Sequence, residues 1–359
     1  ALASFFVFAA IAQGQPPVNV PPVPAAPAAD AAANTPAAPS ITSADPQVQA
    51  IVKLLTGSFR APAAGTQPEL VLHAAVVNVT GLDNAVYFEL HRADTPDAAF
   101  SQGILHVFRQ NAPAPEGSAA GSVEQLMLRV YGFTRLSSTF ADAVVGLWQA
   151  PDAFPPIKSD QLAPIVDVVL QPQGDGAFAG RSTLTPFNQH GASQLLSAWR
   201  ISTAGVSIKD VGLKPDGTEA FGPTAGQPES VFVRFEAPTA VNRLAGGVVA
   251  IDLVPGDGPA ADDGDDIAMH YRGFLASDGF EFDASISNQR PPILVTLPVG
   301  NFIQGWSIAL PGQKMGQVRR LVIPSAMAYG EAGRRSARIP PNATLIFETR
   351  VVYYKDKPA

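Results

Sequence analysis

Short runs of β-forming residues, separated by turn residues, fill the chain from Pro46 to Pro238 and limit what this stretch can fold into. The runs cover residues 70–79, 85–91, 104–109, 124–133, 165–170, 177–184, 195–201 and 231–236. The stretch Lys214-Pro215-Asp216-Gly217 is typical of a hairpin, because proline fixes the first turn angle and glycine tolerates positive φ. Strands this short and regular predict an antiparallel β-barrel or a sandwich, and we expect a mainly β, barrel-like domain at 46–238.

One helix is expected in front of these strands. Apolar residues recur at helical spacing from Gln47 to Leu55, directly behind Asp45, which is a good N-cap residue. Gly57 is expected to end the helix.

The first twelve residues form an apolar run that is too short to span a bilayer. It ends in Ala10-Ile11-Ala12, a small-x-small pattern typical of signal cleavage, so we interpret 1–12 as the remnant of a secretory signal. A lipid-facing anchor and a disordered tail are the alternatives. Residues 13–45 are rich in proline and alanine and predict a disordered linker. With a signal, the protein would work in the periplasm, in the cell envelope or outside the cell.

Length and composition exclude several classes of protein. The 359 residues are long for one domain, since a domain typically takes about 100 to 200 residues, and we expect two. Lys and Arg number 24 against 31 Asp and Glu, so no nucleic-acid partner is expected. The chain has no cysteine, which excludes disulfides, thiol catalysis and thiolate metal sites. The histidines have no metal-ligand spacing, and neither a metal nor a cofactor is expected.

The last third of the chain carries more specific motifs. They are the turn Pro255-Gly256-Asp257-Gly258, the pattern Phe282-Asp283-Ala284-Ser285, the stretch Ile323-Pro324-Ser325-Ala326-Met327-Ala328-Tyr329-Gly330 and the stretch Ile339-Pro340-Pro341-Asn342-Ala343-Thr344. In this order they resemble the FKBP-type peptidyl-prolyl cis/trans isomerases over 246–355, with a linker at 239–245. The resemblance implies an α+β fold in which a twisted antiparallel half-barrel sheet wraps around one short helix. That helix should begin near Ile303 and stop by Pro311-Gly312.

The resemblance also implies a pocket that takes the substrate proline. Trp306 would be its floor, Tyr271, Phe282 and Phe347 its walls, and Asp283 would lie beside the rotating imide. The Ile303 N–H and the Tyr329 hydroxyl would hold substrate carbonyls. The complete expected set is Tyr271, Phe282, Asp283, Ile293, Phe302, Ile303, Trp306, Tyr329, Ile339 and Phe347. Each aromatic ring is alternatively an ordinary core residue.

Three details around this pocket bear on its use. Ile293 stands where many members have phenylalanine, which would lower activity modestly. The loop from Glu331 to Arg338 carries three arginines, and they either favour acidic clients or form a solvated rim. The short stretch between Asp283 and Ile293 has no room for the inserted chaperone domain of some relatives.

The first domain resembles the CpeT/CpcT family of phycobiliprotein chromophore lyase-like barrels. The resemblance is carried by Leu54-Leu55-Thr56-Gly57-Ser58-Phe59, Ala85-Val86-Tyr87-Phe88-Glu89, His106-Val107-Phe108-Arg109-Gln110, Gly146-Leu147-Trp148, Phe178-Ala179-Gly180-Arg181-Ser182-Thr183 and Asp210-Val211-Gly212-Leu213. A cysteine expected near Gly180 is absent. The resemblance implies a tetrapyrrole or other apolar ligand in the barrel. Tyr87, Glu89, Arg109 and Arg234 would be polar groups facing that cavity, or alternatively strand-surface residues.

The sequence therefore predicts a peptidylprolyl isomerase that acts on X-Pro bonds of protein clients outside the cytoplasm, fused to a ligand- or client-binding barrel. Macrolides such as rapamycin are the expected inhibitors. Two alternatives are a non-catalytic scaffold that binds proline-containing peptides, and a pigment-binding barrel with an accessory isomerase.

Overall fold

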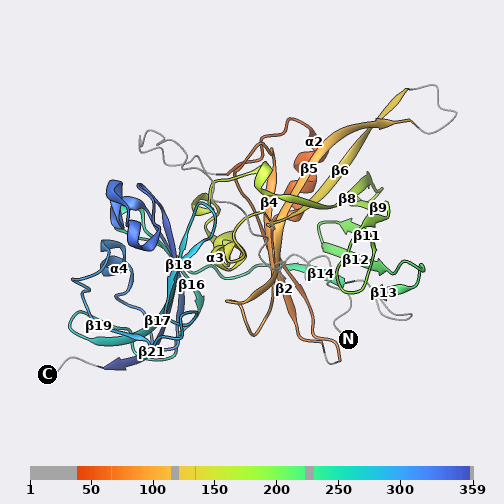
Figure 1. Cartoon of the computed structure of the whole chain (residues 1–359). Helices are drawn as coiled ribbons and strands as arrows, with labels where there is room; N and C mark the ends of the chain where they lie inside the picture. Colours follow the sequence, from red (N-terminus) through yellow and green to blue (C-terminus); the bar gives the residue numbers. More distant parts are fainter. Residues whose placement is uncertain (1–38, 66, 115–120, 134, 223–229, 356–359) are drawn as a thin grey trace. The chain divides into compact units, whose positions relative to one another are not determined.

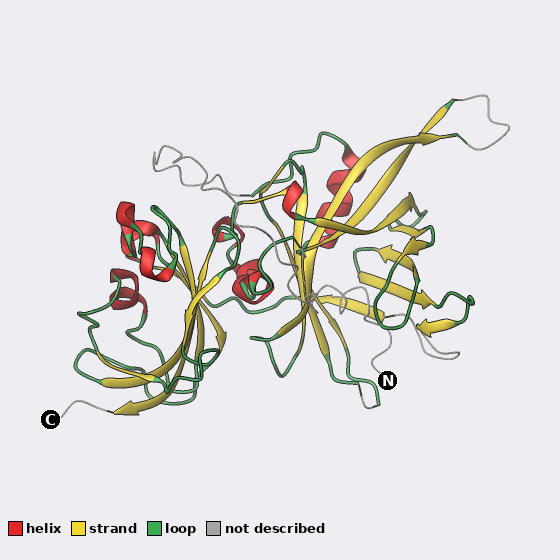
Figure 2. Ribbon diagram, in the orientation of Figure 1, coloured by secondary structure: helices red, strands yellow, loops and turns green. Residues whose placement is uncertain are grey.

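The computed structural model describes residues 39–65, 67–114, 121–133, 135–222 and 230–355 (Figure 1). The predicted signal at 1–12 and most of the predicted linker at 13–45 lie outside these residues. The chain forms two compact units, one of Pro39–Arg135 with Ile157–Pro238, the other of Leu136–Pro156 with the chain from Thr239 onward. Strands predominate in both units (Figure 2). No helix in the described part of the chain is long and apolar enough to cross a bilayer.

Within the described residues, ten antiparallel strands of the first unit close into a barrel. In hydrogen-bonding order they are β1 (Gly57–Ala61), β2 (Leu70–Val76), β4 (Ala85–Arg92), β5 (Ala99–Pro113), β6 (Ser122–Gly132), β8 (Ala163–Pro172), β9 (Phe178–Ser182), β11 (Gln194–Ile201), β12 (Gly205–Leu213) and β14 (Ser230–Phe235). The β11–β12 and β14–β1 pairings close the ring. Short strands β3 (Val79–Thr80), β7 (Ile157–Lys158), β10 (Thr185–Pro186) and β13 (Glu219–Phe221) complete the unit. The prediction of a mainly β, barrel-like domain is confirmed.

Helix α2 (Pro46–Leu55) fills the barrel interior. The Asp45 side chain accepts the N–H groups of Gln47 and Val48 at 2.7 and 3.0 Å, which confirms the predicted cap. The apolar face of α2 belongs to the same buried cluster as the inward side chains of the strands. Because α2 contacts β5 on one side of the ring and β11 and β12 on the other, it crosses the interior. The chain's own side chains therefore occupy the core of this barrel.

In the second unit, a twisted sheet surrounds helix α4 (Gln304–Ala309). Its strands run in the order β15 (Val241–Arg243), β16 (Val249–Val254), β20 (Val318–Ile323), β21 (Leu345–Lys355), β17 (Asp266–Leu275) and β18 (Glu281–Ala284). Strand β19 (Ile293–Thr296) pairs with the first half of β17, and β18 pairs with the second half. The predicted α+β fold is confirmed, with α4 as the short helix against the sheet.

The segment Leu136–Pro156 lies within the sequence limits expected for the barrel domain but is part of the second compact unit. It holds α3 (Phe140–Val144) and the short 3₁₀ helices η1 (Leu147–Gln149) and η2 (Pro151–Ala153). The Thr139 hydroxyl donates to the Gly279 carbonyl at 2.6 Å. Gly279 has φ +74°, and a Cβ there would lie 2.2 Å from the Cα of Phe140, so only glycine permits this approach.

Candidate active site: an aromatic pocket around Trp306

Trp306, on α4, is the centre of an aromatic cluster and is only 3% exposed. Its ring meets Tyr271 of β17 at 5.5 Å and Phe347 of β21 at 5.2 Å, both edge to face. Phe302 stacks on it at 5.2 Å. Such geometries favour aromatic pairs. The indole N–H of Trp306 is buried and has no acceptor among the residues that the structure describes, which is a costly arrangement unless a ligand or water supplies one.

The walls of this cluster depend on a glycine. Phe282 of β18 meets Phe347 edge to face at 5.6 Å. A Cβ on Gly273 of β17 would lie 2.7 Å from an atom of each of these two rings, so glycine makes the room that they fill. Ile339 is buried in the same core, while Ile293, Ile303 and Tyr329 pack against it. Phe302 is 46% exposed and lies at the edge of the cluster.

Asp283 is tied to the pocket wall by two donors. The Tyr271 hydroxyl donates to its carboxylate at 2.7 Å, and the Arg290 guanidinium donates to the same carboxylate. Arg290 also donates to the Tyr271 hydroxyl at 3.1 Å and to the Ala284 carbonyl at 2.8 Å. Burial and, after it, the hydrogen bond to Asp283 raise the pKa of Tyr271 to about 12. Tyr271 therefore keeps its proton and orients Asp283 at neutral pH.

Ser285 explains the last position of the Phe-Asp-x-Ser pattern. Its buried hydroxyl oxygen accepts the backbone N–H of Tyr271 at 2.9 Å. The pattern thus places a ring in the wall with Phe282, orients the pocket with Asp283 and anchors the following turn to β17 with Ser285.

Two groups expected to hold substrate carbonyls differ in their surroundings. In the described part of the chain, the Ile303 N–H has no hydrogen-bond partner. The Tyr329 hydroxyl accepts a hydrogen bond from Arg334 Nη1 at 3.1 Å, and the Arg334 guanidinium lies 5.5 Å from the Tyr329 ring centroid. Tyr329 therefore keeps its own proton available for a further acceptor.

The structure brings all ten predicted pocket residues together on β17, β18, β19, α4, β21 and the loops beside them. The sequence reasoning missed Arg290, the second partner of Asp283. The sequence indicates this pairing only weakly, because an arginine in a turn seven positions after an aspartate can have many other partners.

The polar residues proposed to face the barrel cavity have other partners. Arg109 donates to Asp45 and Gln47 at the start of α2, at 2.9 and 2.6 Å. Arg234 donates to the Thr56 carbonyl at its end, at 2.8 Å. These two side chains hold α2 in place.

Tyr87 and Glu89, unlike Arg109 and Arg234, do not face the barrel interior. They alternate along β4 with Val86 and Phe88, which face the barrel core, so they lie on the other face of the strand. The Tyr87 hydroxyl donates to Glu89 at 2.7 Å.

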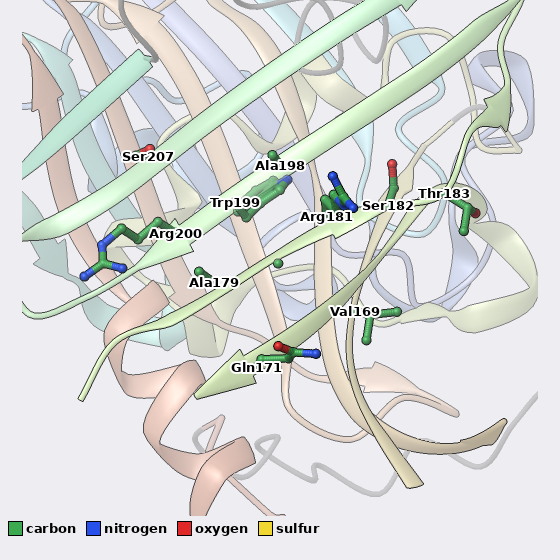
Figure 3. Close-up of a pocket in the computed structure, with 11 residues that line it drawn as sticks. Val169, Gln171, Ala179, Arg181, Ser182, Thr183, Ala198, Trp199, Arg200 and Ser207 are labelled. Carbon is green, nitrogen blue, oxygen red and sulfur yellow. The ribbon is translucent and has the colours of Figure 1, made fainter. Parts of the chain in front are cut away.

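An open pocket of about 710 Å³ lies on the outer face of β8, β9, β11 and β12 (Figure 3). It is lined by Arg181, Arg200 and small residues of the stretch 178–183 that carries the lyase-like resemblance. Arg200 pairs with Asp175. The resemblance and its ligand stay predictions.

The half-barrel around α4 and its aromatic pocket are the features expected of an isomerase domain of this class, and comparisons with known proteins support the class. The model of the FKBP-type peptidyl-prolyl cis-trans isomerase family matches residues 258–352. An FK506-binding protein of Neisseria meningitidis serogroup B is 44% identical over 107 residues, 30% of this chain and 95% of the relative. One of Streptomyces anulatus is 43% identical over 96 residues, 27% of this chain and 77% of the relative.

Solved structures give matches of the same extent. The crystal structure of FkpA from Escherichia coli is 36% identical in sequence where the two chains match. The match covers 33% of this chain and 53% of the FkpA chain, with a TM-score of 0.30. The chain belongs to the FKBP-type peptidyl-prolyl cis-trans isomerase family, through its C-terminal domain.

Proposed function

We propose that the second unit catalyses cis/trans rotation of X-Pro bonds in polypeptide clients. The observation that carries the proposal is the convergence of the ten residues on Trp306, whose buried N–H is unpaired among the described residues. The pocket is apolar at its floor and walls except for the Trp306 N–H and the Tyr271 hydroxyl, and Asp283, Tyr329 and the Ile303 N–H are further polar groups at its edge.

This arrangement suits a reaction in which no covalent bond breaks. Rotation must overcome roughly 18 to 20 kcal/mol of amide resonance. The planar imide is stabilised by charge separation, which water favours and an apolar pocket disfavours, so desolvation lowers the partial double-bond character. Donors that fit the twisted carbonyls better than the planar ones lower the barrier further. Tyr329 and the Ile303 N–H would be these donors, and the Tyr271–Asp283 pair would keep the wall in position.

The proposal includes an action outside the cytoplasm. It rests on the apolar run at 1–12 and its small residues Ala10 and Ala12, which lie outside the described residues. Fractionation of the native host with N-terminal sequencing tests it, with an exported chain that starts near Gln13 as the expected result. A chain that stays in the cytoplasm would refute this part alone.

The decisive experiment measures isomerisation of a short Leu-Pro peptide by the full chain, with and without rapamycin. We expect activity that rapamycin abolishes and that the double substitution Trp306→Ala/Phe347→Ala removes. Phe302→Ala deletes a half-exposed ring and spares the core, and we expect it to lower kcat/KM about two- to tenfold.

Tyr353→Ala is the matched control, because it removes an exposed ring from the same strand as Phe347. It should leave kcat/KM unchanged. A folded wild-type chain without activity on any Leu-Pro peptide would refute the proposal and would favour a non-catalytic binding module.

A further inference from the structure

The loop between Tyr329 and Ile339 lies at the edge of the pocket in a fixed conformation. Both of its end residues belong to or pack against the pocket core. Backbone hydrogen bonds join the Arg334 N–H to the Ile339 carbonyl at 2.8 Å and the Ile339 N–H to the Arg334 carbonyl at 3.0 Å. The Gly333 N–H donates to the Tyr329 carbonyl at 3.2 Å. The loop therefore closes on itself and holds its side chains beside the pocket.

The three arginines of this loop are in contact with pocket residues or exposed beside them. The Arg334 guanidinium contacts the ring and the hydroxyl of Tyr329. The Arg338 guanidinium lies 5.8 Å from the ring centroid of Phe280, which packs against the pocket core. Arg335 is exposed between them. Two of the three charges are thus positioned by aromatic rings of the same region.

These arginines differ in their partners from five other arginines of their unit. Arg243, Arg272, Arg290, Arg319 and Arg320 each pair with a carboxylate. Across the described residues, none of Arg334, Arg335 and Arg338 has a carboxylate at ion-pair distance, although acidic residues outnumber basic ones in the chain. Glu331, in the same loop, is exposed and makes no described ion pair either. The pocket edge therefore carries a local excess of positive charge.

We propose that this arginine rim selects polypeptide segments with a carboxylate within one or two residues of the proline, which rests on the proposed isomerase function. A proline in the pocket forces the flanking residues of its chain to cross the pocket edge. A carboxylate there would meet a planar guanidinium that accommodates bidentate pairing and has no described carboxylate partner to give up. An overall acidic chain would also repel acidic clients elsewhere, so the rim gives them one attractive point of approach.

The test compares peptides that differ only in the residue before proline, with Glu, its neutral isostere Gln, Leu or Lys at that place. We expect kcat/KM for Glu-Pro to exceed that for Gln-Pro by about three- to tenfold at low ionic strength. Lys-Pro should be the poorest substrate. The Glu/Gln ratio should approach one at about 0.5 M salt, because the Debye length then falls well below 10 Å.

The double substitution Arg335→Gln/Arg338→Asn should bring the Glu/Gln ratio close to one, and Arg335→Lys/Arg338→Lys should keep most of it. Asparagine is chosen at 338 because this residue has φ 58°, which asparagine tolerates. Arg60→Gln/Arg181→Gln removes the same charge from the other unit and should leave the ratio unchanged.

Leu-Pro turnover separates the two proposals. If the wild type turns over Leu-Pro with a Glu/Gln ratio of one, the arginine rim does not select clients and the isomerase proposal stands. If Leu-Pro is not turned over at all, the isomerase proposal itself fails. A preference that survives Arg335→Gln/Arg338→Asn would also overturn the role given to the rim.

Discussion

The imidazole of His73 is buried on the face of β2 that points away from the barrel core, and a positive charge is costly there. Its Nδ1 is 2.7 Å from the Ser58 hydroxyl oxygen, and its ring stacks on His91 at 5.2 Å. Glu89 is its register partner on β4. Burial first, and then the charge of His91, lowers the pKa of His73 to about 3. Folding therefore holds this histidine neutral at a pH where the unfolded chain protonates it.

The sign of the pH effect follows from this lowered pKa. The stabilising contribution is fully present above the ordinary histidine pKa of 6.5 and is lost as the pH falls from 6.5 towards 3. Between pH 7 and pH 5 we expect His73 alone to lower the free energy of unfolding of the barrel by about 1–2 kcal/mol. Urea denaturation at the two pH values measures it. His73→Gln should reduce the pH dependence by this amount, and parallel pH profiles for the two proteins would contradict the assignment.

Single residues differ in how well a sequence predicts their roles. The pocket residues could be placed because each lies at a fixed distance from a motif such as Phe282-Asp283-Ala284-Ser285. Arg290, Arg109 and Arg234 could not, because an arginine reaches partners that only the folded chain brings near. Arg109 and Asp45 are 64 positions apart, and Arg234 and Thr56 are 178 apart.

At the scale of elements, alternation and turn chemistry predicted most strands, and the Asp45 cap predicted α2. They missed β1 and β12, whose alternating faces include buried polar residues such as Ser58 and Asp210. Alternation and turn chemistry also did not indicate that Leu136–Pro156 packs with the second unit. Helix α3 is only five residues long, and the contact of Thr139 with Gly279 spans 140 positions, so no local pattern marks it.

Phe140 shows what this segment contributes to the second unit. Its side chain is fully buried, and its backbone lies against Gly279 at the β17–β18 turn that leads to Phe282 and Asp283. Phe140→Ala should lower the stability of the isomerase unit by about 3–5 kcal/mol, the usual cost of truncating a buried phenylalanine. The loss of isomerase activity along a urea gradient measures this effect.

Phe59→Ala is the matched control, since Phe59 is equally buried but belongs to the barrel core. It should destabilise the barrel and leave the urea midpoint of isomerase activity in place. Equal shifts of that midpoint by the two substitutions would contradict the assignment of Leu136–Pro156 to the second unit.

At the scale of the whole molecule, length predicted two domains, but no simple boundary separates them. The chain builds the barrel as far as β6, contributes Leu136–Pro156 to the second unit, returns to complete the barrel, and enters the second unit again at Thr239. A length argument cannot foresee such an exchange, because it assumes that each domain is continuous. The two units nevertheless keep separate cores, one around α2 and one around Trp306.

Separate cores imply separate unfolding transitions, and a ligand of one pocket should move only one of them. A ligand that binds the folded state alone stabilises it by RT ln(1 + [L]/Kd), or about 2.7 kcal/mol at a hundredfold excess over Kd. Rapamycin at that excess should therefore raise the midpoint of the calorimetric unfolding transition of the isomerase unit and leave the other calorimetric transition in place. Trp306→Ala/Phe347→Ala should cancel the shift, while Tyr353→Ala should keep it. A single transition that moves as a whole would mean that the chain exchange through Leu136–Pro156 couples the two cores into one cooperative unit.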